Sequence, residues 1–186
     1  MDRMILVRHA ESTANVDGYF DSRPPGPPLS DAGEAQAVAL ADRLAGHDIR
    51  AILCSTTTRS IGSARPLAEA HHLVPQASED LLEVHCGDLE RKRDPESREI
   101  FTRVFAGWLA GNKDQPLPGG ENAVQIEERM LRAVATVDGV LARGDPGARG
   151  ARRFDPDSAR RVDRRGGGGQ GGLHVSNREL TATSVR

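Results

Sequence analysis

The feature that most constrains the fold is a short apolar run that ends directly in charged residues. Met4-Ile5-Leu6-Val7 is typical of a buried strand, and it continues into Arg8-His9-Ala10-Glu11-Ser12-Thr13-Ala14-Asn15. Ligands bind at the carboxyl ends of the strands in open α/β sheets. A histidine delivered there can attack phosphorus, and an arginine can hold two phosphate oxygens in its planar fork. This opening therefore favours an α/β fold with a phosphate-directed site.

Predicted strands and helices alternate up to about residue 142. Strands are expected over 4–7, 49–54 and 74–77. Helices are expected over 11–16, from a cap at Ser30 or Asp31 to Leu44, and over 57–70, 94–109 and 121–142. Pro66 should kink or shorten its helix, and the prolines of segment 17–28 predict a loop. This alternation predicts a layered α/β fold.

Length and composition limit the kinds of function that this chain can have. A chain of 186 residues is long enough for one domain with a real core. Two cysteines do not make a disulfide framework, and we find neither a leader pattern nor an apolar run near 18 residues. Aromatic residues make up only 3% of the chain, which disfavours a base-stacking nucleic-acid surface. We therefore expect a cytoplasmic protein with no nucleic-acid or membrane partner.

The opening run resembles the motif Arg-His-Gly-Glu-Thr-x-x-Asn of the histidine phosphatase superfamily, the phosphoglycerate-mutase-like enzymes. Ala10 stands in place of its Gly and Ser12 in place of its Thr. Further stretches resemble family motifs in the same order, namely 28–33 with Gln36-Ala37, 54–59, 82–90 and 118–122. In the fourth motif, Leu89 replaces the usual Trp and Arg91 the usual Gly. Together these stretches extend from about Met4 to Ala142.

The resemblance implies a role for each site residue. His9 attacks phosphorus, and Glu83 protonates the departing alcohol. Arg8, Arg59 and Asn15 hold the phosphoryl oxygens. An acid of this kind must be protonated at working pH, so we expect burial to raise the pKa of Glu83. No metal or organic cofactor is implied.

These matches lead to one expected fold and function. The fold is α/β with three layers, a mostly parallel central sheet and helices on both faces; whether one central strand is missing is left open. The function is hydrolysis of a small-molecule phosphomonoester through a phosphohistidine. A hydrolase is favoured over a mutase because the family's cofactor-dependent mutases carry longer chains. The alternative is a non-catalytic, phosphate-binding or inactive remnant.

One family element has no visible counterpart. After the helix ending near Ala142, the family has an apolar strand that completes the central sheet and delivers a second histidine. Residues 148–165 contain only Phe154 and Val162 as large apolar side chains. The only late histidine is His174, which we expect to be a tail residue. The second histidine therefore has no candidate of equal standing to His9.

The chain divides into a domain over 1–146 and an Arg/Gly-rich tail over 147–186. The tail carries nine Arg and four acidic residues, and we expect it to be disordered. Two explanations stay open: a natural basic tail, or GC-rich codons read in a shifted frame. Reading the other frames of the gene after the codon for Gly147 separates them. The shifted-frame explanation fails if no frame encodes an apolar strand followed by His-Gly.

Two rival sites are weaker. Cysteine phosphatases place a nucleophilic Cys six residues before an Arg, whereas Cys54 and Arg59 are five apart with no Gly between them. Residues 166–172 are glycine-rich, but no strand precedes them and no Lys-Ser/Thr follows, as a phosphate-binding loop requires. We therefore expect Cys54 to be structural and the glycines to belong to the tail.

Overall fold

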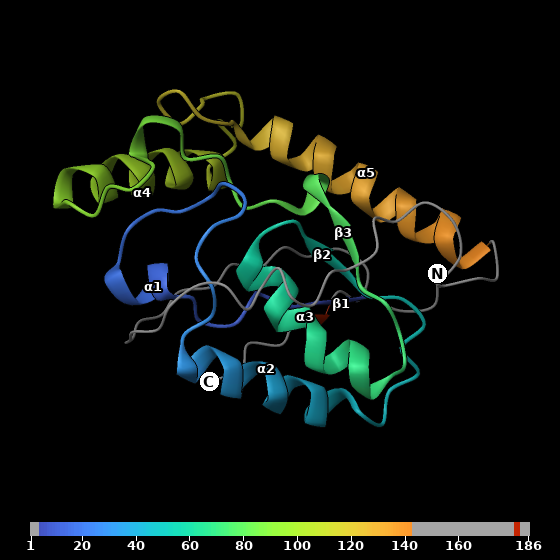
Figure 1. The fold of residues 1–186 in the computed structure, drawn as a ribbon. Coiled ribbons are helices and arrows are strands. Elements are labelled where there is room, and N and C mark those ends of the chain that lie inside the picture. The colour runs from blue at the N-terminus through green and yellow to red at the C-terminus, as the bar shows by residue number, and fades with distance from the viewer. Residues whose placement is uncertain (1–3, 143–180, 183–186) are drawn as a thin grey trace.

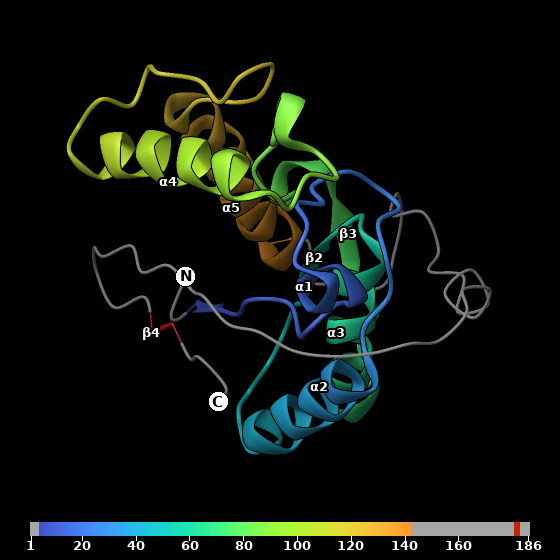
Figure 2. The ribbon, with the colours of Figure 1, turned by 90° about the vertical axis from the view of Figure 1, so that its left-hand side faces the viewer.

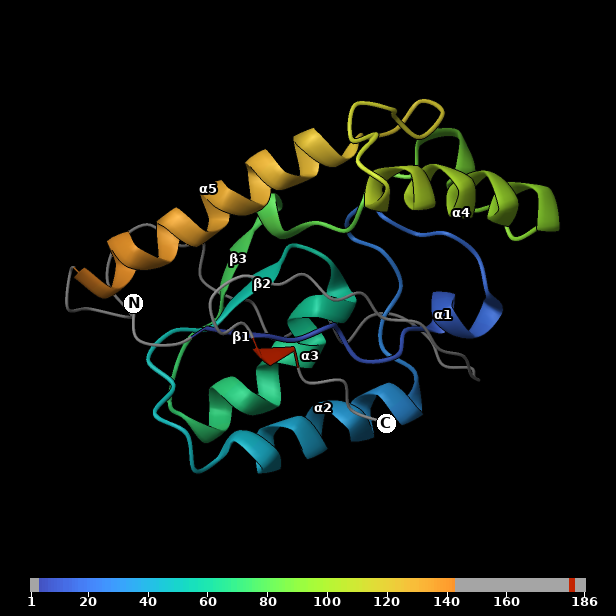
Figure 3. The same cartoon turned by 180° about the vertical axis from the view of Figure 1, so that it is seen from behind.

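The strands lie between two groups of helices in the computed structural model of the protein (Figure 1). The structure describes residues 4–142 and 181–182. Its elements in chain order are β1 (Ile5–Leu6), α1 (Thr13–Asp17), α2 (Asp31–Leu44), β2 (Leu53–Ser55), α3 (Thr58–Ala70), β3 (Gln76–Ser78), the 3₁₀ turns η1 (Glu79–Leu81) and η2 (Gly87–Leu89), α4 (Pro95–Leu109), α5 (Ala123–Ala142) and β4 (Thr181–Ala182). Helices α2 and α3 cover one side of the strands and α5 the other (Figures 1 and 3). The α/β fold class is confirmed.

The strands form two short parallel pairs. β2 pairs with β3, with Leu53 opposite Gln76 and Ser55 opposite Ser78. β1 pairs with β4, with Ile5 opposite Thr181. β4 was not predicted, because it lies in the tail expected to be disordered. The rest of that tail from residue 147, including His174, lies outside the described residues.

Side-chain caps begin the helices close to where the sequence predicts them. Ser30 caps α2, its Oγ accepting a hydrogen bond from the Gly33 N–H at 3.0 Å. Asp94 caps α4 in the same way through the Ser97 N–H at 2.9 Å. Such a cap satisfies one of the donors that a helix start leaves unpaired. The predicted cap at Ser30 is confirmed.

Helix α3 runs through Pro66 to Ala70, so the expected shortening does not occur. Proline removes one backbone hydrogen bond and crowds the preceding turn. The turn beyond it is held by burial, since Leu67 and Ala68 belong to a core cluster that α3 shares with α2 and β2. Tertiary packing here outweighs the local propensity of one residue.

A second core cluster lies under α4. Its centre is Trp108, which is buried and whose Nε1–H donates to the Gln115 carbonyl at 2.7 Å. The aromatic rings are in contact along a row, with centroids 5.0–6.0 Å apart: Phe20, Phe101, Phe105 and Trp108. Phe20 lies in the loop after α1, so this cluster fixes that loop against α4. The view in Figure 2 shows α4 and α5 together on this side of the strands.

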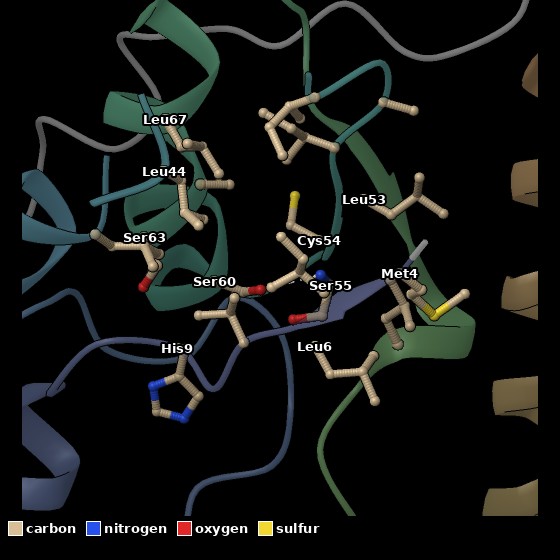
Figure 4. A pocket seen from close by; sticks show the side chains of 18 of the residues that line it. Met4, Leu6, His9, Leu44, Leu53, Cys54, Ser55, Ser60, Ser63 and Leu67 are labelled. Carbon is tan, nitrogen blue, oxygen red and sulfur yellow. Dashed lines mark hydrogen bonds between the residues drawn. The ribbon is translucent and has the colours of Figure 1, made fainter. Parts of the chain in front are cut away.

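A cavity separates β1 from β2. The two strands belong to different pairs, and residues 4–9 and 53–55 line opposite parts of a cavity of about 590 Å³. Figure 4 shows Leu6 of β1 and Leu53 and Cys54 of β2 around it. Helix α5 contributes Met130, Ala133 and Val134. In the part of the chain that is described, the central sheet is therefore divided, in line with the expectation that left one central strand open.

Candidate active site

His9 is held where β1 ends. Its ring Nδ1 lies 2.7 Å from the Ala10 carbonyl oxygen. Since a carbonyl can only accept, Nδ1 must carry the proton. The other nitrogen, Nε2, accepts from Arg59 Nε at 3.3 Å and lies 3.3 Å from Glu83 Oε2. In the neutral ring Nε2 therefore offers its lone pair between a guanidinium and a carboxylate.

The loop after His9 is fixed by side chains from α2 and α3. The Ala10 N–H donates to Ser63 Oγ at 2.8 Å, and the Glu11 N–H donates to Gln36 Oε1 at 2.9 Å. A Cβ on Gly33 would come within 2.0 Å of the Glu11 carbonyl, so only glycine allows α2 this close. The residues of the second motif, Gly33 and Gln36, therefore hold the loop that contains the first motif in place.

Arg59 is a buried cation, with its side chain only 3% exposed. A sequence-based reading of the loop 17–28 missed its main partner, Asp21. Arg59 Nη1 lies 3.2 Å from Asp21 Oδ1, and Arg59 Nη2 donates to the Asp21 carbonyl at 2.8 Å. The only local signal was an acid in a proline-rich loop, and such an acid is usually solvated. The structure thus adds Asp21 to the predicted set.

Glu83 is brought to His9 as predicted, but its pKa moves the other way. Its side chain is half exposed. The hydrogen bond that its carboxylate accepts when His9 Nε2 carries a proton lowers the pKa of Glu83 to about 2, and the charges of His9, Arg59 and Arg8 act in the same direction. The expectation that burial raises this pKa is wrong for this state. Burial does oppose ionisation, but neighbours that favour the charged form outweigh it.

A buried arginine of α5 holds the segment that carries Glu83. Arg129 donates to the backbone carbonyls of Asp80, Leu82 and Glu83 at 2.6–3.2 Å. Its remaining donors meet the Glu121 carboxylate at 2.9 Å. The sequence analysis did not single out Arg129, because its partners lie in distant segments of the chain. It is a positioning group for Glu83.

Two of the predicted phosphate ligands, Arg8 and Asn15, are not among the described contacts of the His9 ring. Arg8 is exposed, and its charge reaches Glu83. Asn15 Oδ1 accepts from both the backbone N–H and the hydroxyl of Ser12, at 2.9 Å each, within the cap of α1. An amide oxygen only accepts, so the amide N–H groups are the part of Asn15 that can bind an anion.

Neither cysteine has the character of a nucleophile. Burial raises the pKa of Cys54 to about 11 and that of Cys86 to about 12. The reactive thiolate is therefore scarce at neutral pH. Among the described side chains, no three His, Cys, Asp or Glu are grouped as metal ligands would be. The described helices include none long and apolar enough to cross a membrane.

Comparison with known proteins identifies the relatives of this site. The family model described as histidine phosphatase superfamily (branch 1) matches residues 4–144. An uncharacterized protein of Mycobacterium tuberculosis (strain CDC 1551 / Oshkosh) is 42% identical over 130 residues, covering 69% of this chain and 62% of that protein. The adenosylcobalamin/alpha-ribazole phosphatase of Salmonella typhimurium is 27% identical over 136 residues, covering 73% and 67%.

Solved structures agree. A mycobacterial glucosyl-3-phosphoglycerate phosphatase, solved in complex with VO3, superposes with a TM-score of 0.59 at 28% identity, covering 73% of this chain and 63% of that one. Other relatives are named as phosphoserine phosphatase and phosphoglycerate mutase. The matched region thus spans 62% of the length of the first of these relatives, and it contains His9, Arg59 and Glu83.

Proposed function

The chain belongs to the histidine phosphatase superfamily, and from this we infer that it hydrolyses phosphomonoesters through a phosphohistidine on His9. The observation that carries the proposal is the position of Nε2 of His9, 3.3 Å from both Arg59 Nε and Glu83 Oε2. A nucleophile, a cation for the transferring group and a carboxyl for the leaving oxygen are thus within one another's reach.

The reaction balances with these groups alone. Nε2 of His9 forms a bond to phosphorus as the ester P–O bond breaks. The Glu83 carboxyl gives its proton to the departing alcohol oxygen. Water then attacks phosphorus, the N–P bond breaks, and the Glu83 carboxylate takes the proton from that water. Arg59 and Arg8 offset the negative charge that builds up on the phosphoryl oxygens.

The low pKa of Glu83 fits this scheme once substrate charge is counted. Without an anion beside it, Glu83 is ionised because His9 and Arg59 favour the carboxylate. A phosphoryl group adds negative charge next to Glu83 and engages the same cations. Both effects raise the pKa of a neighbouring carboxyl. Substrate binding would thus prepare Glu83 to act as an acid.

The alternative is a phosphate-binding protein without turnover. Two observations favour this alternative. The central sheet is divided in the described part of the chain. The described contacts of the His9 ring are with Ala10, Arg59 and Glu83 and involve no second histidine. Transfer to a second acceptor, as in a mutase, stays less favoured than hydrolysis.

The test is an assay of phosphate release from p-nitrophenyl phosphate, with an acid-labile phosphoenzyme sought by acid quench. His9→Ala should abolish both signals. His72→Asn is the matched control, since His72 is exposed beyond the far end of α3 and Asn tolerates its positive φ of 55°. Substantial turnover by His9→Ala would overturn the mechanism. Phosphate binding without any release would favour the alternative.

A further inference from the structure

Arg91 has a backbone conformation that few side chains adopt. Its φ is +64°, in the left-handed region that favours glycine. Two hydrogen bonds hold it there: the Arg91 N–H donates to the Phe20 carbonyl at 2.9 Å, and the Phe20 N–H donates to the Lys92 carbonyl at 3.0 Å. The loop after α1 and the loop after η2 are therefore joined at Arg91. A large side chain at a strained position points to a use for that side chain.

The guanidinium of Arg91 is oriented on one side and open on the other. Nη1 donates to Asp21 Oδ2 at 3.2 Å, and the guanidinium carbon lies 4.3 Å from the centre of the Tyr19 ring. The side chain is nevertheless 68% exposed. A guanidinium has five N–H donors; Asp21 accepts from one, and the Tyr19 side chain also takes part in a hydrogen bond with Arg91. The remaining N–H groups belong to an exposed side chain that Asp21 and Tyr19 hold in place.

That place is the rim of the site. Asp21 is 8% exposed and is shared, its Oδ1 meeting Arg59 and its Oδ2 meeting Arg91. Arg59 in turn meets His9 Nε2. Gly26 packs against the same pair, since a Cβ there would lie 2.7 Å from Arg59 Nη1 and 2.8 Å from Asp21 Oδ1. Arg91 is thus joined to the phosphate-directed Arg59 through a single buried carboxylate.

We propose that Arg91 is a specificity-determining residue that binds a second anionic group of the substrate, so that the preferred substrates are phosphomonoesters which also carry a carboxylate or a second phosphate. The inference rests on the proposed function. The phosphoryl group goes to His9 and Arg59, and the organic part leaves toward the rim. There the open fork of Arg91 meets an anion in two parallel hydrogen bonds. The exposed Lys92 beside it adds positive charge.

The test compares substrates that differ in one group. 3-Phosphoglycerate and glycerol 1-phosphate are both alkyl phosphates, and only the first has a carboxylate. Fructose 1,6-bisphosphate and fructose 6-phosphate differ in a second phosphate. The variant is Arg91→Gly, which removes the cation and suits the positive φ, so its melting temperature should not fall. Arg103→Gln, an exposed arginine on α4, controls for the loss of one charge.

Arg91→Gly should raise the KM for the substrate with the second anion by about tenfold to a hundredfold, the effect of one lost charge-assisted contact. Its kcat on that substrate and its kcat/KM on p-nitrophenyl phosphate should stay within about twofold. If the KM rises for 3-phosphoglycerate alone, the group that Arg91 binds is a carboxylate. If it rises for fructose 1,6-bisphosphate alone, the group is a second phosphate. An equal change in KM on all substrates, or no change on either probe with a second anionic group, overturns the proposal.

Binding measurements distinguish a failure of the proposed function from a failure of the proposal for Arg91. If the wild-type chain releases no phosphate, calorimetry measures its affinity for the same probes. Weaker binding of the two-anion probes by Arg91→Gly, with unchanged binding of glycerol 1-phosphate, would still support the role of Arg91. Identical affinities in wild type and variant would refute it.

Discussion

At the scale of single residues, the site depends on a carboxyl whose protonation follows the charges around it. Glu83 is ionised beside His9 and Arg59 in the structure, and a bound phosphoryl group would favour its protonated form. The same side chain can therefore serve as base and as acid in successive steps. Its role is best tested with leaving groups of different basicity.

Glu83→Gln should slow alkyl phosphates far more than p-nitrophenyl phosphate. An alkoxide needs a proton to leave and p-nitrophenolate does not, so we expect a loss of about 10²–10⁴ in kcat for the former and a much smaller one for the latter. Steady-state kinetics on glycerol 1-phosphate and p-nitrophenyl phosphate measure both. Equal losses on the two substrates would show that Glu83 does not act as the acid.

Glu83 also predicts how stability depends on pH. Its pKa is about 2 in the folded protein and 4.5 for the free side chain, so the folded state favours the carboxylate. The resulting stabilisation is fully present above about pH 4.5 and is lost as the pH falls toward 2. In urea unfolding, the difference in stability between wild type and Glu83→Gln should be full at pH 7, shrink below about pH 4.5 and be smallest near pH 2. A constant difference over that range would contradict the assigned shift.

Arg59 and Cys54 separate the two nucleophile hypotheses. Cys54→Ser should leave activity within a few-fold, because the thiol is buried and its pKa of about 11 keeps it protonated. Arg59→Ala should cost about a hundredfold or more in kcat, as loss of a transition-state charge contact does. The activities of both variants are measured by phosphate release. The opposite ranking would revive a cysteine mechanism.

At the scale of elements, Arg129 of α5 couples a helix to the acid of the site. Arg129→Met should destabilise the fold by about 3–5 kcal/mol, because the partly buried Glu121 carboxylate and the carbonyls of Asp80, Leu82 and Glu83 lose their donor. Chemical denaturation measures this. Arg132→Gln is the control, since that exposed pair with Asp80 should contribute at most about 1 kcal/mol.

A double variant identifies the cause. Glu121→Gln added to Arg129→Met should recover part of the loss, because the unpaired carboxylate is then gone. Purely additive costs would mean that the ion pair does not account for the loss. A further sign of positioning is that Arg129→Met should lower kcat on glycerol 1-phosphate more than on p-nitrophenyl phosphate.

Local signals predicted the elements better than the contacts between them. The cap at Ser30 depends only on neighbouring residues, and it is observed. Pro66 does not shorten α3, because burial of Leu67 and Ala68 holds the turn beyond it. His9, Arg59 and Glu83 were proposed from motifs, and the structure places them next to one another. Asp21, Arg129 and the pKa of Glu83 were not, because each depends on a partner far away in the chain: Arg59 for Asp21, Asp80 for Arg129 and His9 for Glu83.

At the scale of the whole molecule, the divided sheet should make the fold marginal. Among the described residues no strand lies between β1 and β2. Without one, apolar burial worth several kcal/mol is lost from a net stability that is typically only about 5–15 kcal/mol. Unpaired strand edges also invite pairing between chains. We expect a broad calorimetric melt at low temperature and growth of large species in light scattering as concentration rises. A sharp, high-temperature melt of a monomer would contradict this.

The cavity also bears on the fate of the intermediate. His9 lines it together with the hydroxyl-bearing Ser55, Ser60 and Ser63, so polar groups that can hold water lie beside the nucleophile (Figure 4). A phosphohistidine in that position has two possible acceptors: water that enters the cavity, or a second alcohol that must first bind. Partitioning between them follows their local concentrations. An opening that admits water without restriction would bias the chain toward discarding its phosphoryl group instead of passing it on.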